Sequence, residues 1–184
     1  LKNIISLKKK FKNIEIFDHH EAHAASAYFF SGWNKCYVLT IDGWGDNSSS
    51  KFYKAENRRL KELSKTHTID SLGYFYGSIT KLLGYKPHRH EGKILGLAAY
   101  GNPKKAYPYI SKMISYDKLN KCFKGNFEKG IYISNYNNPN LKFLKKKFSP
   151  ADIAAAAQKR IEEVIIQFIK DNVPSGSKLA LAGG

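Results

Sequence analysis

Residues 36–41 (CYVLTI) restrict the fold more than any other stretch, because they form a nearly continuous apolar run that contains β-branched side chains. Such a run is typical of a strand in the interior of a sheet. It leads into residues 42–46 (DGWGD), which we expect to form the tip of a hairpin that returns through residues 50–54. Helical patterns precede and follow this strand, so the sequence indicates an α/β chain.

The other expected elements rest on apolar spacing and on residues that start or stop helices. Ser149 as N-cap and Pro150 at the first helical position mark the start of the last helix, and glycines mark the ends of earlier ones. The pattern predicts helices at residues 21–30, 71–85, 90–101 and 150–172, a short strand at 14–18, and a buried strand at 178–184. Residues 103–148, rich in Lys and Asn, are interpreted as a variable insertion with one further strand at 131–136.

Composition narrows the class of protein. With 184 residues, of which 42% are hydrophobic, the chain suits a folded globular domain. It contains no run of about 18 apolar residues that would span a bilayer. Its first ten residues place their charge after the apolar patch, the reverse of a signal peptide. The sequence therefore predicts a cytoplasmic protein without a membrane role.

Cysteines and net charge exclude or weaken other classes. Cys36 and Cys122 lie far apart without CxxC spacing, so they indicate neither a disulfide framework nor a thiolate metal site. The formal charge of +16 would suit nucleic acid or anionic substrates. Because the lysines are scattered and no nucleic-acid-binding module is recognisable, nucleic acid is the less favoured partner.

Three histidines crowd into residues 19–23. His19 and His23 are four apart, so both imidazoles would project from one face of a helix. With Asp42 at the end of the next strand, they would form a two-histidine-one-carboxylate metal site that leaves positions open for a substrate oxygen. The alternative is an ordinary helix start with solvated histidines, since this spacing also occurs by chance.

Three further groups of residues admit two interpretations each. The glycines of residues 42–46 would let backbone amides approach a phosphate, although a simple turn is favoured for this loop in isolation. Glu91 and Lys93 flank a glycine and would bind an anionic substrate, or would be surface charge at a helix start. Gly183 and Gly184 would form either a nucleotide-binding turn or only a turn.

Five stretches in order resemble the N-terminal catalytic domain of the O-carbamoyltransferases, the family of nodulation proteins and antibiotic-tailoring enzymes. They read DHHEAHAASAYFFSGW, VLTIDGWGDNSS, SLGYFYGSITKLLGY, EGKILGLAAYG and LALAGG. The resemblance implies an actin-like, sugar-kinase-like (ribonuclease H-like) fold, with a mixed sheet and flanking helices. It also implies that residues 1–184 are an incomplete N-terminal domain, inactive alone, which lacks a further acidic metal ligand and the adenylate-forming C-terminal domain.

The same resemblance implies a reaction and roles for residues. A carbamoyl group would pass from carbamoyl phosphate, by way of ATP and carbamoyl adenylate, to a hydroxyl of a sugar or natural product. His19, His23 and Asp42 would hold the metal, Fe²⁺ in the family. Contact with the adenylate would come from Gly43, Gly45, Asp46, Glu91, Gly183 and Gly184.

Two residues receive catalytic roles. Lys93 would offset the negative charge of the adenylate, and His20 would either support a metal ligand or orient the acceptor hydroxyl. Two other functions remain open: threonylcarbamoyl transfer to tRNA, and a non-catalytic basic binding module on the same fold.

Overall fold

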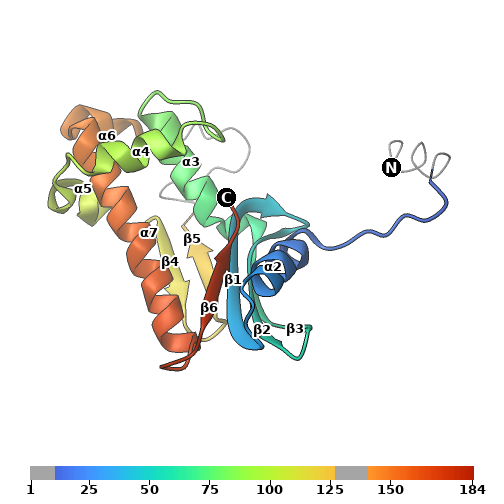
Figure 1. Ribbon diagram of the computed structural model, residues 1–184. Coiled ribbons are helices and arrows are strands. Elements are labelled where there is room, and N and C mark those ends of the chain that lie inside the picture. The colour runs from blue at the N-terminus through green and yellow to red at the C-terminus, as the bar shows by residue number, and fades with distance from the viewer. Residues whose placement is uncertain (1–10, 127–140) are drawn as a thin grey trace.

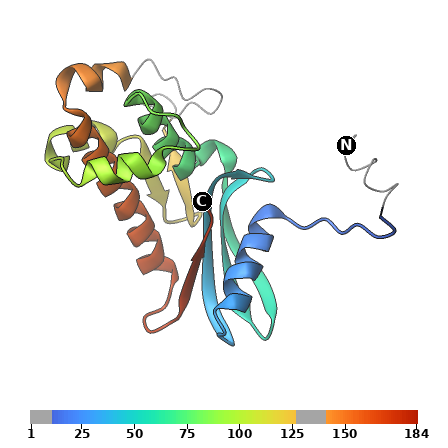
Figure 2. The same ribbon diagram turned by 45° about the horizontal axis from the view of Figure 1, so that its top comes forward.

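The computed structural model describes residues 11–126 and 141–184. A four-stranded sheet lies between helix α2 on one face and a larger helical layer on the other (Figures 1 and 2). The helices are α2 His19–Phe30, α3 Leu72–Leu82, α4 Glu91–Ala98, α5 Pro103–Ile110, α6 Lys142–Lys147 and α7 Pro150–Asn172, with a 3₁₀ turn η1 at Thr68–Asp70. The strands are β1 Lys35–Gly45, β2 Ser48–Glu56, β3 Arg59–His67, β4 Ile114–Asp117, β5 Cys122–Gly125 and β6 Leu179–Ala182.

The main sheet is mixed, in the order β3-β2-β1-β6. Strands β1, β2 and β3 form antiparallel hairpins, whereas β6 runs parallel to β1. Strands β4 and β5 pair with each other in a separate two-stranded sheet. The mixed sheet with flanking helices confirms the α/β class expected from the sequence.

The two hairpin turns have left-handed backbone at both central residues. Asp46 and Asn47 have φ of 47° and 67°, and Asn57 and Arg58 have φ of 52° and 59°. Two such residues define the type I′ turn, whose twist matches that of the flanking strands. The prediction that residues 42–46 form the hairpin tip is therefore wrong. Strand β1 continues through Gly45, and the tip lies at Asp46-Asn47.

The two faces of β1 contribute to different cores, which explains its nearly continuous apolar run. Cys36 and Val38 pack beneath α2 with Ala24 and Tyr28. On the opposite face, Leu39 belongs to the larger core, which also contains residues of α3 and α7. Since side chains alternate along a strand, this register turns the side chain at position 42 toward α2.

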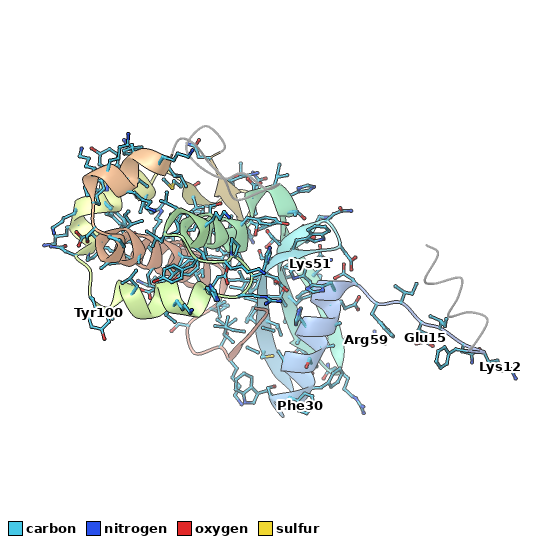
Figure 3. All side chains as sticks on the ribbon, turned by 90° about the horizontal axis from the view of Figure 1, so that it is seen from above. Lys12, Glu15, Phe30, Lys51, Arg59 and Tyr100 are labelled. Carbon is cyan, nitrogen blue, oxygen red and sulfur yellow. The ribbon has the colours of Figure 1, made fainter. Side chains whose placement is uncertain are left out.

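The strand predicted at residues 14–18 is not formed. These residues have no pairing partner in the described part of the chain, and Ile16 and Phe17 are 73% and 66% exposed. They run as extended chain away from the body of the molecule (Figures 1 and 3). Helix α2 starts two residues earlier than expected, at His19, because the Asp18 carboxylate caps it by accepting the Glu21 N–H.

The two outer strands of the main sheet also differ from expectation. The strand predicted to be buried at residues 178–184 exists as β6, but it lies at the sheet edge and Leu181 is 61% exposed. Strand β3, with the sequence RLKELSKTH, was not expected, because its charges obscure the alternation of side chains. Charged side chains are common on edge strands, where they oppose pairing with other molecules.

Residues 103–148 contain more structure than expected. Their described parts form α5, β4, β5 and α6, and they place Ala106, Ile110, Met113, Ile114, Phe123, Leu141 and Leu144 in the larger core. The strand expected at 131–136 lies outside the described residues. The interpretation of this segment as variable stays a prediction, but its described parts pack on α7 as part of the core.

Helix α7 confirms the last predicted helix. The Ser149 hydroxyl accepts the Asp152 N–H, and Pro150 occupies the first turn. At the same end of the helix, the Asp152 carboxylate accepts the Asn102 N–H at 2.7 Å and pairs with Lys105. Within residues 11–126 and 141–184, no helix is both long enough and apolar enough to cross a bilayer.

Replacing Asp152 with Asn is expected to lower the free energy of unfolding near neutral pH but not in acid. The Asn102 N–H, together with Lys105 and Ser149, holds the Asp152 pKa below its usual value against the opposing effect of burial. This stabilisation is complete above the unfolded aspartate pKa of about 3.9 and is lost as pH falls from there through the lower folded value. Urea denaturation of both proteins across pH 2–7 tests this; a difference independent of pH would contradict it.

Candidate metal site and adjoining cavity

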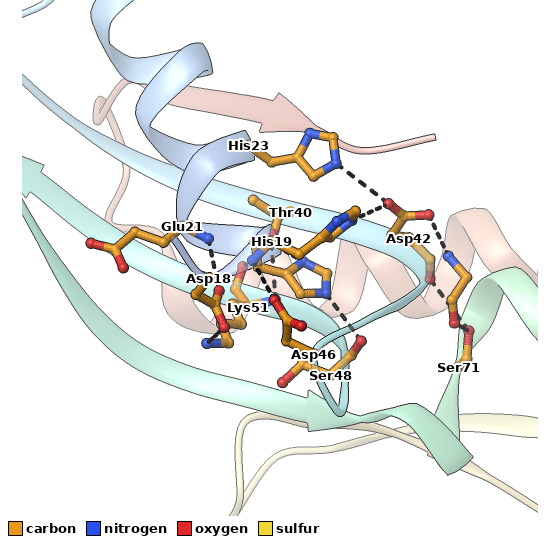
Figure 4. Close-up of polar contacts among 12 residues, drawn as sticks. Asp18, His19, Glu21, His23, Thr40, Asp42, Asp46, Ser48, Lys51 and Ser71 are labelled. Carbon is orange, nitrogen blue, oxygen red and sulfur yellow. Dashed lines mark hydrogen bonds and ion pairs between the residues drawn. The ribbon is translucent and has the colours of Figure 1, made fainter. Parts of the chain in front are cut away.

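The structure brings together the two histidines and the aspartate that spacing had grouped. His19 Nε2 lies 2.8 Å and His23 Nε2 3.5 Å from Asp42 Oδ2. One possible ligand atom from each residue lies within 4.8 Å of the other two. The imidazoles project from the first turns of α2 toward the carboxylate on β1 (Figure 4). All three side chains are partly exposed, at 38%, 37% and 25%, so the group is accessible from solvent.

The surroundings of Asp42 favour its anionic form. Burial alone would raise the pKa of this carboxyl. The hydrogen bond with His19, the bond from the Gly43 N–H at 2.7 Å, and the nearby charges of His19 and His23 outweigh burial and hold the pKa below its usual value. A carboxylate beside two imidazoles is a donor set that divalent transition metals accept.

His20, although adjacent to His19 in sequence, has a different environment. Its side chain is fully buried, with Nδ1 2.9 Å from Thr40 Oγ1 and Nε2 3.1 Å from the Ser48 carbonyl oxygen. Burial lowers the pKa of His20 and so favours the neutral imidazole. The bond to Ser48 opposes this effect only in part. His20 lies between α2 and the β1–β2 hairpin, and it does not line the cavity of about 660 Å³ that lies beside Asp42.

Two residues expected to contact a cofactor, Gly45 and Asp46, lie against the first turn of α2. The Asp46 carboxylate accepts the His19 N–H at 2.8 Å. A Cβ placed on Gly45 would lie 2.1 Å from His19 Cδ2, so the glycine makes room for this imidazole. In this structure, Gly45 and Asp46 therefore support the position of His19.

A cavity of about 660 Å³ adjoins the histidine–aspartate group, and Asp42 is part of its wall. Its lining comes from the end of β1, from α3, α4 and the segment between them, from α7, and from the C-terminal glycine. The lining residues are Ile41, Asp42, Gly43, Trp44, Gly73, Tyr74, Tyr76, His88, Glu91, Gly92, Leu95, Gln158, Ile161 and Gly184. Three residues predicted to contact the adenylate, Gly43, Glu91 and Gly184, thus share one cavity.

Two other predicted site residues do not line this cavity. Lys93 is exposed, and its Nζ lies 5.8 Å from the centre of the Tyr85 ring. Gly183 has a φ of 119°, and a Cβ there would lie 1.8 Å from the Ile41 carbonyl oxygen. Gly183 is therefore required for the close approach of the chain end to β1.

Sequence reasoning missed the residues that join α3 to the site. The Ser71 hydroxyl donates to the Gly43 carbonyl at 2.7 Å and accepts the Tyr74 N–H as N-cap. Gly73 lets α3 approach β1, because a Cβ on it would lie 2.7 Å from Gly43 Cα. Ser71 was recognisable as a residue that starts a helix, but its contact with β1 had no local signal.

On the wall formed by α3 and α7, the Tyr76 hydroxyl donates to Gln158 Oε1 at 2.8 Å. Burial, and to a lesser extent the charges of Glu162 and Glu91, raise the pKa of Tyr76 to about 12. Tyr76 is therefore a neutral hydrogen-bonding group at this wall. No sequence signal links two residues 82 positions apart.

An α/β domain with a half-open histidine–aspartate group beside a cavity has the features of a ligand-binding enzyme domain. Comparison with known proteins identifies the family to which this domain belongs. The family model described as carbamoyltransferase N-terminus matches residues 1–184, so the chain belongs to the carbamoyltransferase N-terminal domain family.

The chain is also similar to several longer curated proteins. The chain is 32% identical to an uncharacterised protein of Methanocaldococcus jannaschii, over 97% of this chain and 32% of that protein. It is 29% identical to nodulation protein NolNO of Sinorhizobium fredii, over 93% and 25%, and 27% identical to nodulation protein NolO of Bradyrhizobium diazoefficiens, over 91% and 31%. The chain thus spans about a third or less of the length of these relatives.

Proposed function

We propose that this chain forms the metal-binding part of an O-carbamoyltransferase. The enzyme would transfer a carbamoyl group from carbamoyl phosphate, by way of carbamoyl adenylate, to a hydroxyl of a sugar or natural product. The observation that carries the proposal is the meeting of His19, His23 and Asp42 at the wall of a cavity, in a chain of this family.

The donor set fits the proposed metal. Two imidazoles and one carboxylate suit Fe²⁺ or a similar divalent ion, and three protein ligands leave positions open for a substrate oxygen. His19 and His23 would each offer Nε2, and Asp42 would offer Oδ2. When bound, the ion would act as a Lewis acid toward the charge that develops during transfer.

The cavity would hold the carbamoyl adenylate. Gly43 and Gly184 carry no side chain that obstructs a bound nucleotide, and Gly43 has open space where a Cβ would be. The Glu91 carboxylate is fixed by the His88 N–H at 2.8 Å. Lys93 would need a different side-chain conformation to contact the adenylate, since its Nζ lies near Tyr85.

We further propose that the fold is actin-like. Its support is the sheet, in which three antiparallel strands in chain order are followed by a parallel strand beside the first. The adenylate-forming domain, a further acidic metal ligand and a cytoplasmic location also stay proposals.

Carbamoyl transfer by the complete gene product tests this function. With [¹⁴C]carbamoyl phosphate, ATP and Fe²⁺, we expect label on the hydroxyl of a saccharide acceptor, loss of transfer on chelation, and recovery when Fe²⁺ is restored. A parallel assay supplies tRNA with [¹⁴C]threonine, bicarbonate and ATP, because a threonylcarbamoyl group contains the amine of threonine and cannot keep the NH₂ of carbamoyl phosphate. Label on tRNA alone would instead support threonylcarbamoyl transfer. Salt-dependent tRNA binding with no transfer and no metal binding would support a basic binding module.

A further inference from the structure

The strand that carries Asp42 is irregular at that residue. Along the β1–β2 ladder, Ile41 pairs with Ser50, and the next pair is Gly45 with Ser48, so residues 42–44 of β1 face Ser49 alone. Such a bulge bends the strand and changes the direction of its side chains. It also removes ladder hydrogen bonds that would otherwise fix the backbone here. The position of Asp42 relative to α2 therefore needs support from outside the ladder.

His20 contacts the hairpin on both sides of this bulge. Its Nδ1 lies 2.9 Å from the hydroxyl of Thr40, which precedes the bulge on β1, and its Nε2 lies 3.1 Å from the carbonyl of Ser48, which pairs with Gly45 at the other end of the bulge. The ring is fully buried, so water does not compete for these bonds. One side chain of α2 thus spans the irregular part of the hairpin.

The hydrogen-bond partners assign the proton of this ring. A carbonyl oxygen only accepts, so Nε2 carries the proton and donates it to Ser48. In the neutral ring, Nδ1 then accepts from the Thr40 hydroxyl, whose oxygen in turn accepts the Lys51 N–H at 3.1 Å. The same hydroxyl lies 3.2 Å from the Lys51 carbonyl, a longer contact than that with Nδ1. Every polar group in the resulting chain of hydrogen bonds has a partner.

We propose that His20 is a positioning residue, which joins α2 to the two ends of the bulge and thereby sets the distances from His19 and His23 to Asp42. The inference rests on the proposed metal site. His19 and His23 belong to the same two turns of α2, and Asp42 belongs to the bulge. A shift of the helix against the hairpin would therefore change both imidazole–carboxylate distances at once.

Co²⁺ is the probe for the test, because its visible absorption reports coordination geometry. His20→Gln and His20→Asn each retain part of the hydrogen bonding of the ring, and Thr40→Val removes only the hydroxyl from the other partner. We expect each variant to bind Co²⁺ about 10–100-fold more weakly than the original chain, as is typical when residues that orient metal ligands are lost, with a shifted absorption band. Thr80→Val is the control, since it deletes an equally buried hydroxyl on α3, and it should bind Co²⁺ normally.

A second readout needs no metal. In ¹H–¹⁵N spectra of the full chain, which has six histidines, His20 should carry its proton on Nε2. The resonances of His19 and His23 should move in Thr40→Val but not in Thr80→Val. A folded Thr40→Val protein with unchanged His19 and His23 resonances and normal Co²⁺ affinity would overturn the inference. If the original chain binds no Co²⁺, the proposed function fails, and the metal-free spectra still decide the role of His20.

Discussion

Replacing Asp42 with Asn is expected to abolish tight binding of divalent metal by this chain. The amide keeps the shape of the side chain and can still accept the Gly43 N–H. It removes the negative charge, and it offers an NH₂ group or a neutral oxygen to the two imidazoles. We expect the affinity for Co²⁺ to fall on the order of 100-fold or more, beyond the roughly 10–100-fold losses caused by residues that only orient ligands. Titration calorimetry on the full chain measures this loss.

Glu21→Gln provides the matched control for Asp42→Asn. Glu21 lies in the first turn of the same helix, and the substitution removes the same charge, but its side chain is exposed and is not part of the histidine–aspartate group. The control should bind Co²⁺ like the original chain. Equal affinities for both variants would show that Asp42 contributes only net charge, and the assignment of Asp42 as a ligand would then be wrong.

Sequence patterns predicted the grouping of His19, His23 and Asp42 because each part follows from local geometry. A spacing of four places two side chains on one face of a helix, and an apolar run identifies the strand segment that leads to Asp42. Both elements exist, and they pack on each other as the grouping requires. What local rules did not give is the distance between the helix and the strand, which depends on the packing of Ala24 and Tyr28 against β1.

The position of His20 illustrates a signal that was present but not used. His20, Ala24 and Tyr28 are spaced by four residues, and all three form the buried stripe of α2. Extending the apolar stripe by one turn would have placed His20 in the core, about 100° around the helix from His19. Three histidines close in sequence therefore divide into two candidate ligands and one buried residue.

Other parts of the site had no local signal. The turn at Asp46-Asn47 was obscured by the glycines before it, although Asp and Asn tolerate left-handed backbone. The contact of Ser71 with Gly43 and that of Tyr76 with Gln158 join residues 28 and 82 positions apart. Only the packing of α3 and α7 on the sheet brings these pairs together, so the shape of the cavity was not predictable from the sequence.

Replacing Gly45 with Ala is expected to displace His19 and weaken metal binding without removing any ligand. The new methyl group would lie 2.1 Å from Cδ2, 2.4 Å from Cγ and 2.9 Å from Cβ of His19. Because Cβ itself is too close, rotation of the ring alone does not relieve the overlap. Helix α2 cannot simply withdraw, since the His19 N–H is bound to Asp46 and His20 is bound to Ser48.

The expected cost of Gly45→Ala is about 1–3 kcal/mol in the free energy of unfolding, as for other overpacked sites. The affinity for Co²⁺ should fall about 10–100-fold because His19 moves from its position beside Asp42. Gly96→Ala is the control: Gly96 lies within α4 with no atom within 4 Å of the added Cβ, so the change should stabilise by up to about 1 kcal/mol and leave Co²⁺ binding unchanged. Normal Co²⁺ affinity in Gly45→Ala would mean that the added methyl group is accommodated, and that His19 does not depend on this glycine for its position.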